Sequence, residues 1–469
     1  MKTTFKYAVL ALSVAAATTA FAAGEATNVI FFLGDGMGPT TVTASRIYKY
    51  GEAGQLGMET LTRTARIRTY SNDAQTTDSA PSMAAYMTGV KMNNEVLSMS
   101  ADTKAYNGNT PYVASSGDST CPASGNGSPV ATLLELSKTA GKAVGAVTTT
   151  RVTHATPAAT YAHICHRDGE NDIAAQFVPG SGKFNAALGS GVDVLLGGGS
   201  KFFLPTSAGG KRTDGKDLTA LLQTAGYTYV NTGAAFKAVD AAATSKLVGL
   251  FNKDHLNYEL DRAKTANNID EPSLADMTEK AIKVLQKNSK GYFLMVEGGR
   301  IDHALHGTNA KRALEDTIAF DDAIKRALSL VDLKNTLIVV TADHDHTMTF
   351  NGYSHKGNPI LGKVSDIKPT TVNKGVPVLA KAADGLAYTA LVFGNGGGPR
   401  KSTRDDLSAV DTAADDYLQE VAVNLGLPGS ETHGGGDVML LSGGAGSSGF
   451  KGTMVNTKVF GLVKAALGL

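Results

Sequence analysis

The sequence predicts an α/β protein, a three-layer αβα sandwich in which helices cover both faces of a central, mostly parallel sheet. Three stretches carry this prediction, at 28–34, 292–296 and 336–341, because each is a nearly continuous apolar run. Such runs are typical of strands that are buried on both faces. An acidic residue stands within two positions of the end of each run, and ligands of open α/β sheets bind beyond the carboxyl ends of the strands. We therefore expect a polar site at one edge of the sheet.

The first 22 residues have the pattern of a secretory signal peptide. Lys2 and Lys6 precede a mostly apolar run at 8–17, and Ala20-Phe21-Ala22 supplies the small residues of a cleavage site. No cysteine follows this run to suggest a lipoprotein anchor, and no second stretch is long enough to span a bilayer. We expect residues 23–469 to form a single exported domain that is periplasmic or secreted and has no membrane anchor.

The composition is that of an ordinary globular protein and argues against a polyanionic partner. Of the 469 residues, 42% are hydrophobic and 19% are charged, so the chain can bury a large core. Removing Lys2 and Lys6 from the 44 basic residues leaves 42 against 43 acidic ones, a formal charge near −1. This balance gives no support for nucleic-acid binding or for binding to a membrane surface.

Cys121 and Cys165 are the only cysteines of the chain. An even count in an exported protein fits one disulfide that closes a long loop, and two buried free thiols are the alternative. Cys121 lies in a stretch at about 101–128 that is rich in Gly, Ser, Asn and Thr, which we expect to be a surface loop.

The other elements are expected in the following order. The first half should contain an edge strand at 63–70, a helix that starts near Ser79 and is closed by Gly89, a helix at 129–140, a strand at 143–150 and a short strand at 193–199. Residues 200–272 show no clear period and should form loops and short helices. The second half should contain a helix at 273–287, a long helix with one apolar stripe after Gly307 and a strand at 438–441. Residues from about 347 to 432 should form a crown-like insertion on the rim of the sheet.

Ser79 is the candidate nucleophile of the chain. It precedes a compact helical run, so its hydroxyl would lie where unpaired backbone N–H groups favour an anion such as phosphate. The alternative is that Ser79 only caps the helix, which is the commoner role of such a serine. Arg167 offers a planar fork of donors that is suited to two oxygens of a phosphate.

Residue types that bind metals gather where strands are expected to end. Asp302 and His306 are four apart, so on a helical turn they share a face and can share a metal. Imidazoles mixed with carboxylates suit zinc, whereas a cluster of oxygens alone suits magnesium. In chain order the candidate ligands are Asp35, Glu297, Asp302, His306, Asp343, His344 and His433, with Thr156 as a neutral oxygen.

Taken together, these motifs strongly resemble those of alkaline phosphatases. The resemblance runs from Asn28 essentially to the C-terminal strand and rests on residues 34–38, 78–80, 151–157, 296–303, 341–344 and 431–433. It implies one zinc held by Asp302, His306 and His433, a second zinc held by Asp35, Asp343 and His344, and one magnesium held by Asp35, Thr156 and Glu297. His154 and His303 stand where the best-known enterobacterial form has Asp and Lys, and both would lie just outside the ligand shell. The resemblance also implies a homodimer.

The activity implied by the resemblance is the hydrolysis of phosphate monoesters at alkaline pH through a phosphoserine on Ser79. Arg167 would hold the non-bridging oxygens, and inorganic phosphate would be product and inhibitor. The two zincs would stabilise the attacking and leaving oxygens of a reaction that enzymes accelerate by up to ~10²¹. The wider superfamily also includes sulfatases, phosphodiesterases and phosphomutases, and an exported binding protein without turnover is a further alternative.

Overall fold

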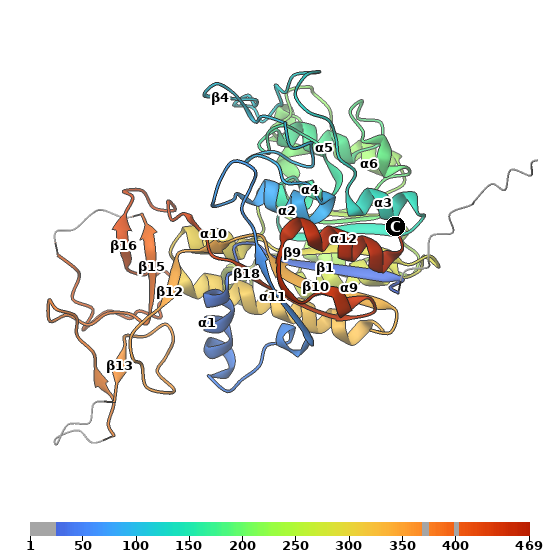
Figure 1. The fold of residues 1–469 in the computed structure, drawn as a ribbon. Coiled ribbons are helices and arrows are strands. Elements are labelled where there is room, and N and C mark those ends of the chain that lie inside the picture. Colours follow the sequence, from blue (N-terminus) through green and yellow to red (C-terminus); the bar gives the residue numbers. More distant parts are fainter. Residues whose placement is uncertain (1–24, 368–374, 398–402) are drawn as a thin grey trace, which may run out of the picture.

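A ten-stranded sheet forms the centre of the molecule, and helices pack on both of its faces (Figure 1). The structure is a computed structural model that describes residues 25–367, 375–397 and 403–469. The predicted signal peptide at 1–22 lies outside the described residues. The strands follow the order β19-β2-β18-β10-β1-β9-β5-β6-β8-β7 across the sheet.

Nine of the ten strands run in the same direction, because only β18 pairs antiparallel with its neighbours. The prediction of a mostly parallel sheet is therefore confirmed. The strands are β1 (Asn28–Gly34), β2 (Arg63–Arg68), β5 (Ala143–Arg151), β6 (Val194–Gly198), β7 (Thr228–Val230), β8 (Leu247–Leu250), β9 (Tyr292–Gly298), β10 (Thr336–Ala342), β18 (Val438–Gly444) and β19 (Gly452–Val455).

The three apolar runs of the sequence form the adjacent central strands β10, β1 and β9. Every residue of β9 and of β10 is buried, and so are six of the seven residues of β1. Burial on both faces explains why these strands show no alternation of apolar and polar residues.

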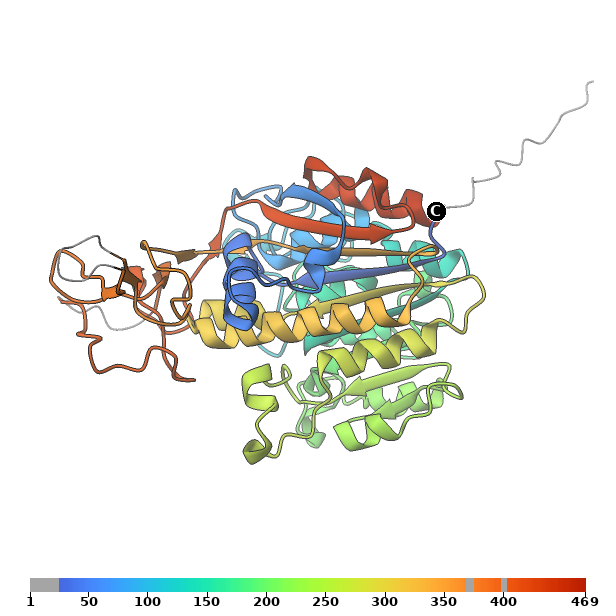
Figure 2. The same cartoon turned by 90° about the horizontal axis from the view of Figure 1, so that it is seen from below.

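Helices cover the sheet in two layers, which confirms the three-layer arrangement (Figures 1 and 2). One face carries α2 (Ser79–Thr88), α3 (Leu133–Thr139), α4 (Ala155–Tyr161) and α12 (Asn456–Leu467). The other face carries α1 (Pro39–Tyr50), α9 (Leu274–Leu285) and α11 (Ala310–Leu330). The apolar stripe of α11 is buried against the sheet side, and Ser273 caps α9 by accepting a 3.1 Å hydrogen bond from the backbone N–H of Asp276.

Two expectations about individual elements were wrong. The strand at 63–68 is not at the edge of the sheet, because β2 lies between β18 and β19 and the last four residues before α12 supply the edge. The stretch at 200–272 contains two sheet strands, β7 and β8, besides α6 (Leu218–Thr224), α7 (Gly233–Ala238) and α8 (Glu259–Arg262). Both strands have only three or four residues, too few to show a period.

The described residues between 347 and 432 form a lobe that projects from the body of the molecule near α1 and α10 (Arg300–His306), in orange in Figure 1. Its described part holds a three-stranded sheet of β12 (Met348–Phe350), β15 (Leu391–Gly396) and β16 (Val421–Asn424). A second small sheet pairs β13 (Ser365–Asp366) with β14 (Val378–Leu379).

A disulfide joins Cys121 to Cys165, with the two Cα atoms 5.9 Å apart. It ties the long loop at 101–128, which contains the short hairpin of β3 (Tyr106–Asn107) and β4 (Thr110–Pro111), to the segment between α4 and α5 (Glu170–Phe177). Among the described residues, no helix has both the length and the apolar character needed to cross a membrane.

Candidate active site

Three carboxylates meet because the strands that carry them end at the same level of the sheet. In the register, Leu33 of β1 pairs with Glu297 of β9 and with Thr341 of β10. Asp35 follows the end of β1 and Asp343 follows the end of β10, so both lie at this edge beside Glu297. All three acidic side chains are 0% exposed.

Helix α10 (Arg300–His306) brings Asp302 and His306 to the same edge, one helical turn apart. His306 Nε2 lies 3.3 Å from Asp302 Oδ1 and 3.2 Å from His433 Nε2. His433 Nε2 is 3.5 Å from the same Asp302 oxygen, and its Nδ1 donates a 2.8 Å hydrogen bond to the carbonyl of Thr77. Two imidazole nitrogens and one carboxylate oxygen therefore converge on one point, as zinc requires.

Ser79, Asp35 and His344 form the neighbouring group. Ser79 Oγ lies 3.2 Å from His344 Nε2 and 3.4 Å from Asp35 Oδ1. His344 Nε2 is also 3.2 Å from Asp35 Oδ1 and 3.5 Å from Asp343 Oδ2. The ring of His344 stacks on the ring of His433 with their centroids 3.5 Å apart, so this group lies directly against the group that contains His433.

Ser79 is the first residue of α2, but the cap of this helix is Asp78. The carboxylate of Asp78 accepts a 2.6 Å hydrogen bond from the backbone N–H of Ala80. The Ser79 side chain is thus not needed for capping and points instead at Asp35 and His344. Its position at the helix N-terminus, where the macrodipole favours negative charge, suits a group that acquires an anion.

Arg167 contacts Asp78, the residue before Ser79, and is oriented by its neighbours. Its Nη1 pairs with Asp78 Oδ1 at 3.2 Å, and its Nη2 donates to His154 Nε2 at 3.0 Å. The backbone N–H of Arg167 donates to the carbonyl of Glu95 at 2.8 Å. Burial opposes the charged form, but the carboxylates of Asp78 and Glu95 outweigh it and raise the pKa of Arg167. The guanidinium is therefore a fixed cation at this site.

A third group lies on the other side of Asp35. One donor atom each of Asp35, Glu297 and His154 lies within 4.8 Å of the others. Glu297 Oε2 accepts hydrogen bonds from Thr148 and, at 3.1 Å, from Thr150. The structure thus places His154 among potential ligands rather than outside them, so this group is not made of oxygens alone.

The buried carboxylates repel one another unless cations lie among them. Burial, followed by the charges of Asp343, Asp302 and Glu297, raises the pKa of Asp35 well above its usual value. Burial also raises the pKa of Glu297 to about 7. Such acids remain together in an interior only when protonated or bound to cations.

The residues at this edge fit metal ions. Four buried oxygen atoms here have no hydrogen-bond partner within the described chain: Asp35 Oδ2, Thr156 Oγ1, Glu297 Oε1 and Asp343 Oδ2. Buried polar atoms without partners are costly, and those of Asp35, Glu297 and Asp343 are carboxylate oxygens that metal ligation would satisfy.

His346 and Glu431 are site residues that the sequence reasoning missed. The short strands β11 (Asp345–His346) and β17 (His433–Gly434) pair His346 with His433. His346 Nε2 lies 2.7 Å from Asp302 Oδ1, and its Nδ1 lies 2.6 Å from Glu431 Oε2. Burial lowers the pKa of His346, but these two carboxylates raise it overall to about 9. The signal was available, because His346 stands two residues after His344 and a short strand points both to one side.

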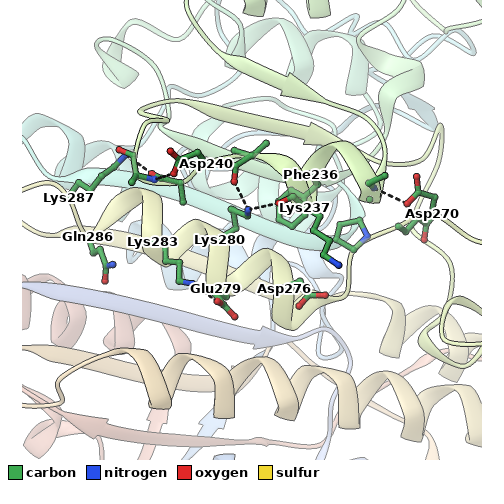
Figure 3. A pocket seen from close by; sticks show the side chains of 17 residues that line it. Phe236, Lys237, Asp240, Asp270, Asp276, Glu279, Lys280, Lys283, Gln286 and Lys287 are labelled. Carbon is green, nitrogen blue, oxygen red and sulfur yellow. Dashed lines mark hydrogen bonds and ion pairs between the residues drawn. The ribbon is translucent and has the colours of Figure 1, made fainter.

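A cavity of about 960 Å³ lies elsewhere, between α7 and α9 (Figure 3). Three of its four lysines are already engaged: Lys280 donates to the carbonyl of Val239 at 2.6 Å, Lys287 donates to that of Ala241 at 2.7 Å, and Lys283 pairs with Glu279 at 2.6 Å. Acidic side chains line the same cavity, so it lacks the charge and the reactive groups of the strand-end site.

The fold and the donor set define the class of protein: a metal-dependent hydrolase whose site lies at the carboxyl ends of a parallel sheet. The family model described as alkaline phosphatase matches residues 26–469. The tissue-nonspecific alkaline phosphatase isozyme of Homo sapiens is 38% identical over 457 residues, which cover 89% of this chain and 79% of the relative.

Solved structures agree with the sequence comparison. The alkaline phosphatase of Thermus thermophilus has a TM-score of 0.67 at 27% identity, covering 98% of this chain and 96% of that chain. The alkaline phosphatase from the Antarctic bacterium TAB5 has the same fold, with a TM-score of 0.64 at 23% identity over 95% and 99% of the two chains. The chain belongs to the alkaline phosphatase family, and its activity is phosphate monoester hydrolysis.

Proposed function

We propose that this chain hydrolyses phosphate monoesters by a double displacement in which Ser79 is the nucleophile and Arg167 binds the phosphoryl oxygens. The observation that carries the proposal is the position of Ser79 Oγ, 3.2 Å from His344 Nε2 and 3.4 Å from Asp35 Oδ1 at a helix N-terminus. Because Asp78 caps the helix, helix capping does not explain why the Ser79 hydroxyl lies beside His344 and Asp35.

The donor groups suggest which metals the chain takes. Asp302, His306 and His433 would hold one zinc, and Asp35, Asp343 and His344 a second. Asp35, Thr156 and Glu297 would hold magnesium, with His154 close enough to share in that site. When bound, the metals supply positive charge that stabilises the attacking and leaving oxygens of the displacement. A variant of the TAB5 enzyme is described with magnesium bound in its M3 site, which supports a third metal in the family.

The protein groups then have distinct tasks. Arg167 holds two phosphoryl oxygens, so the phosphorus faces Ser79 Oγ in line with the departing ester oxygen. Asp35 accepts the hydrogen bond of the Ser79 hydroxyl, which makes the oxygen a better nucleophile. The bond from Ser79 Oγ to phosphorus forms as the ester P–O bond breaks. The hydroxyl proton passes through Asp35 to solvent, and the departing oxygen takes up a proton from solvent and leaves as the alcohol. Water then attacks the phosphoserine, which releases phosphate and restores the hydroxyl.

We further propose that residues 1–22 direct export to the periplasm or the medium, and that the mature chain 23–469 is a single domain that forms a homodimer. The disulfide between Cys121 and Cys165 supports an oxidising compartment. The lobe at 347–432 supports association, because it exposes large apolar side chains: Tyr353 is 92% exposed, Leu427 69% and Val423 58%. Light scattering on the mature protein tests the homodimer, and a molar mass equal to that of one chain at micromolar concentration would contradict it.

The activity is tested with p-nitrophenyl phosphate and bis(p-nitrophenyl) phosphate on metal-replete protein, together with a metal count. We expect the monoester to be preferred by several orders of magnitude, with about two zincs and one magnesium per chain and loss of activity on chelation. Preference for the diester would indicate a phosphodiesterase. Binding of phosphate without turnover of either ester would indicate a binding protein.

A further inference from the structure

His163 and Glu135 form an ion pair in the interior of the protein. His163 Nε2 lies 2.7 Å from Glu135 Oε1 on α3, and His163 Nδ1 lies 2.7 Å from the carbonyl oxygen of Ser98. The side chains of His163 and Glu135 are 9% and 2% exposed. Neither residue takes part in the double displacement, which therefore does not explain why this pair is present.

Both ring nitrogens of His163 face atoms that only accept hydrogen bonds. A carbonyl oxygen is such an acceptor, and so is an ionised carboxylate. Glu135 is ionised because it also accepts hydrogen bonds from the backbone N–H of Thr132 at 2.8 Å and from the side-chain amide of Asn185 at 2.6 Å. His163 must then donate from both nitrogens, which makes it an imidazolium cation.

The surroundings of His163 favour this charge at neutral pH. Burial lowers the pKa of His163, but the hydrogen bond and the charge of Glu135 outweigh burial and raise it above the ordinary value of 6.5. Glu135 faces the ring from α3, whereas α5 presents the uncharged amide of Gln176, which bonds to the backbone of His163 at 2.9 Å. The stability that the pair contributes is therefore complete below the unfolded pKa of about 6.5 and is lost as the pH rises through the folded pKa.

One acceptor of this imidazolium belongs to the short segment 95–98, which holds the backbone of Arg167. The carbonyl of Glu95 accepts a hydrogen bond from the backbone N–H of Arg167 at 2.8 Å. Leu97 and Ile164 exchange two backbone hydrogen bonds, of 3.0 and 3.1 Å. The chain around Arg167 therefore takes its position from this segment.

The same segment has a costly backbone conformation. Glu95 and Ser98 have φ angles of 70° and 51°, in the left-handed region that residues other than glycine disfavour. Such a conformation persists only where the surrounding contacts determine it. The hydroxyl of Ser98 donates to the carbonyl of Ala159 at 2.7 Å, and its own carbonyl accepts from the backbone N–H of Val130 at 3.0 Å and from His163. The bond from His163 is the one of these three that a change of pH can remove.

We propose that the buried ion pair of His163 and Glu135 positions Arg167 for the phosphoryl group, and that loss of the His163 proton at alkaline pH weakens phosphoryl binding. The inference rests on the proposed function, because it takes Arg167 as the group that binds the phosphoryl oxygens. Glu135 keeps His163 charged, and the imidazolium holds the segment 95–98. That segment in turn fixes the backbone of Arg167. Product phosphate should therefore leave more readily as the pH rises.

The first test compares the inhibition constant of inorganic phosphate in the wild-type holoenzyme and in His163→Gln from about pH 6 to about pH 10. A charged hydrogen bond is worth about ten- to a hundredfold in binding, so we expect the variant to bind phosphate about tenfold more weakly near pH 6. The ratio of the two constants should approach one near pH 10, because the wild type has then lost the same bond. Titrations that both enzymes share, such as that of phosphate itself, cancel in this ratio. A ratio that does not change with pH overturns the proposal.

Glu135→Gln tests the charge of the pair. It removes the carboxylate that raises the pKa of His163, so phosphate affinity should fall at a pH about one unit or more below that of the wild type. His355→Gln is the matched control, because His355 Nδ1 also faces a backbone carbonyl, that of Ser365 at 3.0 Å, but lies in the projecting lobe. The control should follow the wild type at every pH. The same loss in His355→Gln as in His163→Gln contradicts the proposal.

KM and kcat separate positioning from a role in stability alone. Partial unfolding of a variant lowers the apparent kcat per chain but leaves KM and the phosphate inhibition constant of the folded molecules unchanged. His163→Gln should instead raise KM for p-nitrophenyl phosphate and the phosphate inhibition constant together, each by about tenfold near pH 6. A lower kcat with both constants unchanged refutes the positioning role.

A double-mutant cycle distinguishes this inference from the proposed role of Arg167. Arg167→Gln alone should weaken phosphate binding by about tenfold or more, and an unchanged inhibition constant in that variant refutes the role of Arg167 itself. Because the pair acts through Arg167, adding His163→Gln to Arg167→Gln should change the constant by less than about twofold. Two full and additive losses refute the positioning role even though Arg167 binds phosphate.

NMR of holoenzyme labelled at histidine Cε1 measures the proton on His163 directly. The resonance that is absent from His163→Gln identifies the residue. It should titrate with a pKa above 6.5, at the pH where the ratio of the phosphate inhibition constants falls. A His163 that is already neutral near pH 6, or that stays protonated at a pH where the ratio has fallen to one, overturns the proposal.

Discussion

Replacing Ser79 by alanine separates the chemistry of the site from the stability of the fold. The hydroxyl makes two long hydrogen bonds, of 3.2 and 3.4 Å, in a side chain that is 3% exposed. Removing it should cost about 1 kcal/mol of unfolding free energy, because the cap of α2 remains with Asp78. The barrier to turnover should rise far more, by about 4 kcal/mol or roughly a thousandfold in rate, since no phosphoserine can form.

The assay for Ser79→Ala combines turnover of p-nitrophenyl phosphate with denaturant unfolding and a zinc count. Ser82→Ala is the matched control, because Ser82 lies in the same first turn of α2 and its hydroxyl donates a 2.7 Å hydrogen bond to the carbonyl of Asp343. The control should lose a similar amount of stability but keep its turnover within a few fold.

The stereochemistry gives a second and independent reading of the role of Ser79. Two in-line displacements each invert the configuration at phosphorus, so transfer to an added alcohol such as Tris should proceed with overall retention. Inversion, or turnover of Ser79→Ala within tenfold of the wild type, would refute the reasoning and leave Ser79 as a buried hydroxyl with no catalytic role.

Three further predictions concern residues around the site. Burial lowers the pKa of His303 to about 3, so its imidazole is neutral at alkaline pH. The added positive charge in His303→Lys should tighten phosphate inhibition several-fold and slow turnover at high pH. An unchanged inhibition constant would contradict this. Burial raises the pKa of Asp316 to about 8. The stability that the protonated Asp316 carboxyl allows is therefore complete below the unfolded pKa of about 3.9 and is lost as the pH rises to 8. Unfolding free energies measured from pH 5 to 9 should fall less in Asp316→Asn than in the wild type, and equal slopes would exclude this effect. Glu431→Gln should lower zinc affinity about tenfold in a chelator competition, because Glu431 orients His346 and through it Asp302; unaltered affinity would mean that this contact has no such role.

The sheet and the ends of its long strands could be predicted because their signals are local. The runs that became β1, β9 and β10 are nearly continuous in apolar residues, and Asp35, Glu297 and Asp343 stand at or just beyond their ends. Parallel strands bring such ends together whatever their separation in sequence, so a strand prediction also places these acids. The spacing of four residues between Asp302 and His306, also a local signal, placed them on one helical face.

The sequence could not reveal features that depend on pairing between distant segments. The strand β2 was placed at an edge because nothing in its own residues shows that β19 pairs with its outer side. His346 was overlooked because its role depends on Asp302 and Glu431, which come from two other parts of the chain. His255 lies against His154 and His303 only because the segment after β8 reaches past β6 to the end of β5, and its neighbours in the sequence give no hint of this.

The disulfide has a consequence for when and where the protein becomes active. Cys165 stands two residues before Arg167, whose backbone N–H is held by Glu95, so the covalent bond to Cys121 fixes the short segment that presents the guanidinium. In a reducing compartment this restraint is missing, and we expect a newly made chain to bind phosphate esters weakly there. Under the export proposed above, oxidation outside the cytoplasm would complete the segment that presents Arg167 to the substrate.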